Sequence, residues 1–103
     1  MAIVLYQVKT TINEERDDEF NRWYNEVHCP DVLSFRGCVS ARRYRSFYGD
    51  ESHQYLTVYE FQDEATFSRW VDSEHRARMV SDYEDMWGPM NAARSGYVQI
   101  WPA

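Results

Sequence analysis

Residues 1–30, MAIVLYQVKTTINEERDDEFNRWYNEVHCP, decide the fold. The segment 2–9 is β-branched and aromatic with few polar positions, which is typical of a strand covered on both faces. A capping-box pattern follows it, with Thr11 as N-cap and Glu14 three residues later. This pattern predicts the start of a helix.

The predicted first helix carries one apolar stripe. Its members recur at helical spacing and are Phe20, Trp23, Tyr24, Val27 and His28. Proline cannot donate the next helical hydrogen bond, so Pro30 is expected to end the regular helix. Residues 31–35 are then expected to form an irregular turn.

The remaining chain predicts three more strands and two more helical segments. The strands are expected at 38–47, 54–61 and 95–101, with a polar hairpin loop at 48–53. Asp63 is expected to cap a helix with the stripe Phe67, Trp70 and Val71. After a break at 72–74, the last helical stripe comprises His75, Met79, Tyr83 and Met86 or Trp87.

The element order is therefore β-α-β-β-α-β, an α+β ferredoxin-like fold with a four-stranded antiparallel sheet in a single domain, 1–103. Right-handed crossovers place both helical layers on the same sheet face. The other face stays bare in so short a chain. The simplest cover is a second copy, so we expect a homodimer through the sheet faces, a dimeric α/β barrel.

Composition and motifs narrow the function. The net charge of −6 argues against a nucleic-acid partner. The N-terminus lacks the features of a signal peptide, and no run of residues is apolar enough to span a membrane, so a cytoplasmic location is expected. Two cysteines form no disulfide framework or metal site. No phosphate loop or dinucleotide fingerprint occurs, so we expect no cofactor.

Two histidines carry the main chemical signal. His28 and His75 lie on apolar helical stripes that face one layer, so they are expected to meet there as an acid–base pair, although each could simply pack. His53 lies in the polar loop and is expected to be solvated. Asp31 could orient His28 or cap the following turn. Of Arg42 and Arg43, which point to opposite sheet faces, at most one can enter a pocket.

The segments 23–30 and 35–44 resemble the EthD-like pattern of the dimeric α/β-barrel superfamily. That pattern has an aromatic helix, a His-x-Pro element and a Pro-Gly-aromatic entry to the second strand. Arg36 and Cys38 depart from it. The resemblance implies a pocket between helices and sheet. By similarity to a plant cyclase of the superfamily, His75 matches a catalytic histidine, Tyr24 matches a pocket tyrosine, and the strand residues Val4, Tyr6, Tyr55, Thr57 and Tyr59 face the helices.

These observations favour a cofactor-independent lyase, isomerase or cyclase acting on a small aromatic or polyketide-like molecule. His28, His75 and Tyr24 are the predicted catalytic residues. The predicted substrate contacts are Val4, Tyr6, Tyr55, Thr57, Tyr59, Met79, Tyr83 and Trp87. Two alternatives stay open, a cofactor-free monooxygenase of phenolic substrates and a non-catalytic small-molecule binder.

Overall fold

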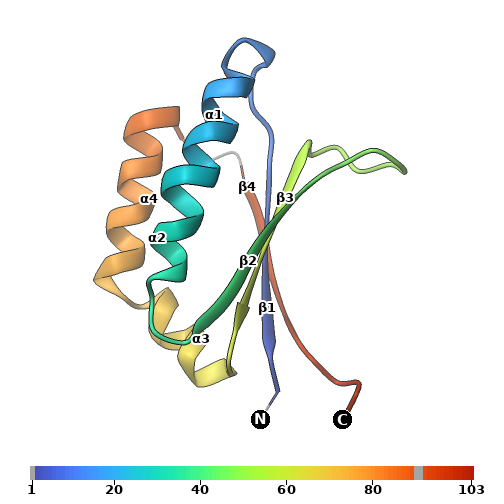
Figure 1. The fold of residues 1–103 in the computed structure, drawn as a ribbon, viewed down its shortest axis with the longest axis vertical. Coiled ribbons are helices and arrows are strands. Elements are labelled where there is room, and N and C mark those ends of the chain that lie inside the picture. The colour runs from blue at the N-terminus through green and yellow to red at the C-terminus, as the bar shows by residue number, and fades with distance from the viewer. Residues whose placement is uncertain (1, 90–91) are drawn as a thin grey trace.

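Strand β1, Val4–Thr10, is the centre of the sheet, as its apolar composition predicts (Figure 1). The computed structural model describes residues 2–89 and 92–103. In it, β1 pairs antiparallel with β3, Tyr55–Phe61, on one side and with β4, Ala92–Val98, on the other. Strand β2, Cys38–Arg45, pairs outside β3 and completes the four-stranded order β2-β3-β1-β4. This is the predicted ferredoxin-like topology.

The helical segments all lie on one face of this sheet, as the crossover rule requires (Figure 1). In chain order they are the 3₁₀ turn Glu14–Arg16, α1 Asp17–Trp23, the π-helical segment Tyr24–His28, α2 Cys29–Leu33, α3 Glu64–Val71 and α4 Glu74–Trp87. Two predicted starts are confirmed by their capping bonds. The backbone N–H of Thr66 donates to Asp63 at 2.8 Å, and that of Arg76 donates to the Ser73 hydroxyl at 3.0 Å.

The sheet face under the helices is the one expected. Val4, Tyr6 and Val8 are buried on β1, and they lie opposite Phe61, Tyr59 and Thr57 of β3, which are buried too. Successive strand residues point to opposite faces, so the next set of residues points away from the helices. That bare face carries apolar side chains, among them Tyr44 and Tyr97, which are 49% and 55% exposed.

The capping box at Thr11 was a wrong prediction. The first helical turn begins at Glu14, with Asn13 in the N-cap position. The cause is tertiary. β1 continues through Thr10, and the Ile12 backbone N–H donates to the side-chain carbonyl of Gln54 at 2.8 Å. That bond holds the connection extended past Thr11.

Pro30 does not end the first helical layer, again contrary to prediction. The chain passes through a π-helical segment, in which the Cys29 N–H donates to the Tyr24 carbonyl, and continues as α2. The wider π turn shifts the hydrogen-bond pattern just before the proline, whose ring would otherwise clash with the preceding turn. Pro30 then lies in the first turn of α2, where a missing N–H is tolerated.

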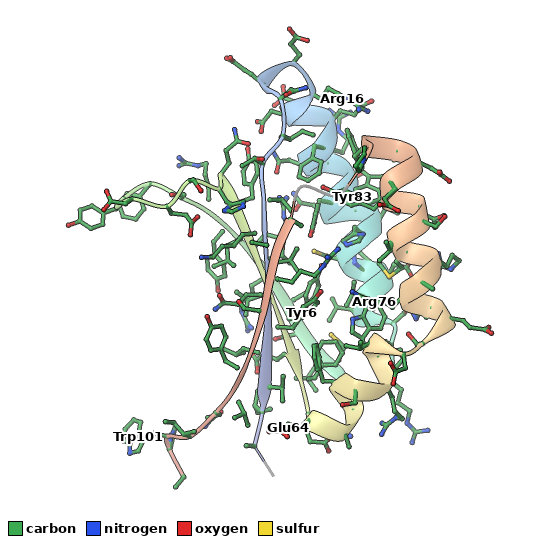
Figure 2. The ribbon with its side chains drawn as sticks, turned by 180° about the vertical axis from the view of Figure 1, so that it is seen from behind. Tyr6, Arg16, Glu64, Arg76, Tyr83 and Trp101 are labelled. Atoms are coloured by element: carbon green, nitrogen blue, oxygen red, sulfur yellow. The ribbon has the colours of Figure 1, made fainter. Side chains whose placement is uncertain are left out.

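Strand ends and stripe edges also differ from the predictions. β2 stops at Arg45, and β4 spans Ala92–Val98 instead of 95–101. The aromatic character of the C-terminal end favoured the later strand, but Trp101 is 83% exposed and projects from the end of the chain (Figure 2). Val71 and Met86 are exposed, so Trp87 is the inward member of the last stripe.

Candidate functional site

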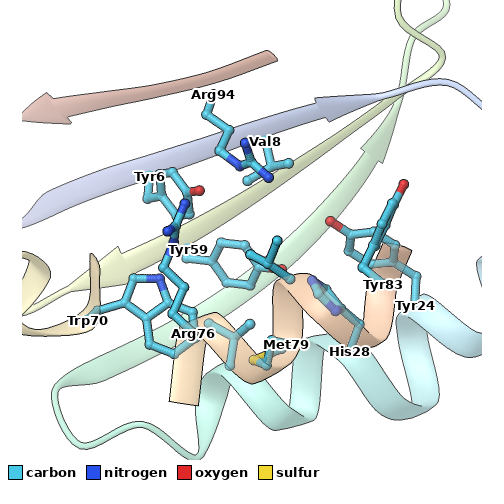
Figure 3. A pocket seen from close by; sticks show the side chains of 12 residues that line it. Tyr6, Val8, Tyr24, His28, Tyr59, Trp70, Arg76, Met79, Tyr83 and Arg94 are labelled. Atoms are coloured by element: carbon cyan, nitrogen blue, oxygen red, sulfur yellow. The ribbon is translucent and has the colours of Figure 1, made fainter. Parts of the chain in front are cut away.

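A pocket opens between the sheet and the helical layer, where the resemblance placed it (Figure 3). The space between its lining side chains is about 410 Å³, and this volume includes the part that is open to solvent. Six of the predicted site residues line it, and they are Tyr6, Tyr24, His28, Tyr59, Met79 and Tyr83. The pocket thus draws on β1, β3, α4 and the π-helical segment.

His28 is the only histidine among the residues that line this pocket. It is the last residue of the π-helical segment, a type of irregularity that is frequent at functional sites. Aromatic rings surround its imidazole, with ring centroids of Tyr24 at 4.6 Å, Trp23 at 5.0 Å and Tyr83 at 6.1 Å. Within residues 2–89 and 92–103, no side-chain hydrogen bond engages His28, which leaves its ring nitrogens available to a ligand.

The environment keeps His28 neutral. The pKa of His28 is lowered from 6.5 to about 4, mainly by burial; the nearby Asp31 carboxylate opposes the shift, and the Arg43 guanidinium contributes to it. Desolvation disfavours the charged imidazolium because the surrounding rings cannot replace its hydration. At neutral pH the ring can therefore accept a proton.

Burial keeps three tyrosines of the pocket, Tyr24, Tyr59 and Tyr83, protonated. Burial raises the pKa of Tyr24 to about 12 and also raises the pKa values of Tyr59 and Tyr83. The Tyr59 hydroxyl also lies 3.9 Å from the Cys29 sulfur, deep in the core. Neutral phenols donate hydrogen bonds, so these side chains are suited to orienting a ligand oxygen and not to removing a proton.

Arg43 packs against Tyr24, one of the side chains that line the pocket. Its guanidinium lies 4.3 Å from the Tyr24 ring centroid and donates to Asn25 at 2.8 Å. Arg42 points to the other sheet face and pairs with Glu60 at 3.2 Å. The predicted split of the two arginines is confirmed, and the cation–π contact fixes Tyr24 in place.

His75 does not meet His28 in the pocket. Its Nε2 lies 2.8 Å from a carboxylate oxygen of Asp31, and its ring packs against Trp70 at 5.2 Å. Arg78 donates to both oxygens of the same carboxylate at 3.2 Å. Burial opposes ionisation of Asp31, but the bonds from His75 and Arg78 outweigh it and lower the carboxyl pKa. Asp31 thus ties α2 to α4. Of the two roles that the sequence left open, orienting His28 or capping the following turn, the first is not found.

Four further predicted contacts lie beside the pocket and not on its surface. Val4 and Thr57 are buried on the helix-facing side of the sheet. Tyr55 bonds through its hydroxyl to Asp17 and Asn21. Trp87 packs on Phe20 at 5.1 Å and under the Arg16 guanidinium. These four side chains pack in the core that surrounds the pocket.

Sequence reasoning missed the polar side of the pocket. Arg76 of α4 and Arg94 of β4 line it, as do Trp70 and the three valines Val8, Val32 and Val80. Trp70 could have been found from its place on the α3 stripe. Arg76 and Arg94 belong to no motif, because only the packing of α4 beside the sheet edge brings them to one opening.

Two absences apply to residues 2–89 and 92–103. No group of three or more His, Cys, Asp or Glu side chains in these ranges is arranged to hold a metal ion. No helix formed by these residues is both long and apolar enough to cross a membrane.

Solved structures share this fold over nearly the whole chain. An EthD-family protein from Bacillus halodurans is 13% identical, covering 97% of this chain and 100% of its own, with a TM-score of 0.73. A DABB-family protein with a ferredoxin-like fold from Mesorhizobium loti is 17% identical over 97% and 99%, with a TM-score of 0.77. A dimeric ferredoxin-like protein of unknown function from Thermobifida fusca is 6% identical over 95% and 92%, with a TM-score of 0.64.

The fold therefore defines a ferredoxin-like protein, as the sequence predicted. The chain belongs to the family described as a domain of unknown function, DUF4286, whose model matches residues 3–95. No curated protein shows significant similarity to the sequence.

Proposed function

We propose that this protein is a cofactor-independent lyase, isomerase or cyclase that moves a proton on a small aromatic or polyketide-like molecule. The observation that carries the proposal is His28. It is a neutral imidazole without a side-chain hydrogen bond in the described chain, and it lines an aromatic pocket. A ring of this kind can take a proton from a bound carbon or oxygen acid.

The surrounding phenols would assist the transfer. As the substrate loses its proton, negative charge develops on its oxygen, and the protonated hydroxyls that line the pocket, those of Tyr24, Tyr59 and Tyr83, would donate to it. The new anion would in turn stabilise the imidazolium form of His28 and raise its pKa during the reaction. His75 and Asp31 would contribute by holding α2 and α4 in place.

A homodimer is part of the proposal. The bare sheet face presents Leu5, Leu56 and Val58 between the more exposed Tyr44 and Tyr97. The similar Thermobifida fusca protein is described as dimeric. Pairing two such faces would remove the apolar surface from water. Light scattering after size exclusion should give twice the 12.4 kDa chain mass, and Tyr97→Arg should shift it to the monomer. A monomeric wild-type protein would refute the dimer.

Proton transfer can be tested without knowing the natural substrate. Wild-type protein is incubated in D₂O with small aromatic ketones and 1,3-diketones, and exchange of the acidic C–H is followed by ¹H NMR. We expect catalysed exchange that His28→Ala abolishes. The matched control, His53→Ala, removes a loop imidazole bonded to Glu51 and should keep the wild-type rate.

The same assay separates the alternatives. Turnover that requires dissolved oxygen would instead identify a cofactor-free monooxygenase of phenols. Probes that bind and are recovered without exchange or conversion would identify a binding protein. Exchange that persists in His28→Ala would disprove the proposed role of His28.

A further inference from the structure

We infer that the pocket selects anionic ligands, aromatic carboxylates, and that Arg76 and Arg94 hold the carboxylate at its opening. This inference rests on the proposed small-molecule site and names its substrate class. The two guanidinium groups reach the pocket from different elements, α4 and β4, and Figure 3 shows the Arg76 side chain ending near Tyr6 and the Arg94 side chain ending near Val8.

The sheet register explains how Arg94 reaches the pocket. Arg94 is paired with Val8 of β1, and Val8 is buried on the helix-facing side of the sheet. An arginine side chain is therefore aimed into the layer that its neighbours fill with apolar groups. The next helix-facing position on β4 is Gly96, opposite Tyr6, and it carries no side chain.

The position of Arg76 in α4 favours the binding of an anion beside it. It lies in the first turn of α4, where the helix dipole disfavours a positive side chain. Its guanidinium forms no ion pair within the described part of the chain. Asp31, the acid that α4 does engage, is bonded to His75 and Arg78 instead.

The charge pattern adds specificity. The chain carries a net charge of −6, so its general field repels anions. Cations at the opening of a largely apolar pocket would reverse that field locally. Arginine is well suited to this, because its planar donors match both oxygens of a carboxylate. Tyr6, Tyr59 and Trp70 would then contact the attached aromatic ring.

Paired probes test the inference. Salicylate and its neutral counterpart salicylamide have nearly the same shape and differ in the carboxylate. Titration calorimetry on the wild-type protein should show salicylate binding at least about tenfold more tightly, the range expected for charge-assisted hydrogen bonds. Its affinity should also fall as salt is raised, while that of salicylamide stays level.

Variants assign the effect to the two arginines. Arg76→Gln and Arg94→Gln should each weaken salicylate about five- to tenfold and leave salicylamide within twofold. Arg69→Gln, on the exposed side of α3, removes the same charge outside the pocket and should change neither affinity. Unchanged unfolding midpoints would show that the variants are folded.

Failure of this inference can be told from failure of the proposed function. Equal binding of the two probes, or variants that keep the wild-type preference, would overturn carboxylate selection. Proton exchange on neutral ketones that still depends on His28 would leave the proposed function standing. No binding of either probe would also overturn the inference.

Discussion

Two helical histidines, both predicted to face one layer, lie in contrasting surroundings. His28 is enclosed by the rings of Trp23, Tyr24 and Tyr83, and its side chain forms no hydrogen bond in the described chain. His75 lies between α4 and α2, where the carboxylate of Asp31 binds its ring at 2.8 Å. The two sites use the same side chain for different purposes.

The difference depends on whether the ring nitrogens of each imidazole are already hydrogen-bonded within the protein. A ring bonded to a carboxylate stabilises the structure, since its nitrogen is already engaged. A desolvated ring whose nitrogens have no side-chain partner contributes less to the stability of the fold, but its nitrogens can bind a ligand or accept a proton. The comparison supports the proposed proton transfer at His28 and a structural role for His75.

The largest expected effect is on catalysis. His28→Ala should lower kcat/KM by about 10²- to 10⁴-fold, because the proton acceptor is lost. His75→Ala should lower it by less than about tenfold, through looser packing of α2 against α4. Steady-state kinetics on a substrate found in the exchange assay measures both values. Equal losses would restore the original hypothesis of an acid–base pair.

A second effect concerns stability against pH. The unfolded chain protonates His28 near its ordinary pKa of 6.5, but the folded protein does so only near 4. Between these values the unfolded state binds more protons, so the free energy of unfolding should fall as pH decreases from 6.5 to 4. The loss should reach up to about 3 kcal/mol and level off below pH 4.

Urea denaturation at several pH values measures this slope. His28→Leu should remove most of it, and the control His53→Ala should retain it. Asp31 acts in a lower pH range. Because its pKa is lowered in the folded state, its contribution is present above its ordinary value of 3.8 and is lost as pH falls below that. An unchanged slope in His28→Leu would contradict the assignment of a desolvated imidazole.

A smaller effect is expected from Asp31→Asn. The change removes the charge that joins His75 and Arg78, and the free energy of unfolding at pH 7 should fall by about 1–2 kcal/mol. Asp82→Asn is the matched control, since Asp82 pairs with the same Arg78 at 3.1 Å and both side chains are exposed to solvent. It should cost less than about 0.5 kcal/mol. Equal costs would mean that the bridge to His75 adds nothing.

The sequence predicted more of the pocket than of its chemistry. Helical spacing of 3.6 residues placed Tyr24 and Tyr83 on the stripes that face the sheet. The strand period showed that Tyr6 and Tyr59 each share a face with their strand neighbours, but only the resemblance to the superfamily predicted that this face meets the helices. The arginines at the opening could not be found this way. Arg76 and Arg94 are distant in sequence, and each alone looks like a solvated cation.

The sequence alone determined the β-α-β-β-α-β order and the place of His28 on an aromatic helical stripe, since these follow from local periodicity. The helix-facing side of the sheet was predicted from the resemblance to the superfamily and not from the strand period. Tertiary structure decided which partner each polar group has. Asp31 lies three residues after His28, yet it bonds His75, whose helix packs alongside. Hydrogen bonds and desolvation depend on contacts between elements distant in the chain, so only the folded molecule distinguishes the desolvated imidazole of His28 from the carboxylate-bonded imidazole of His75.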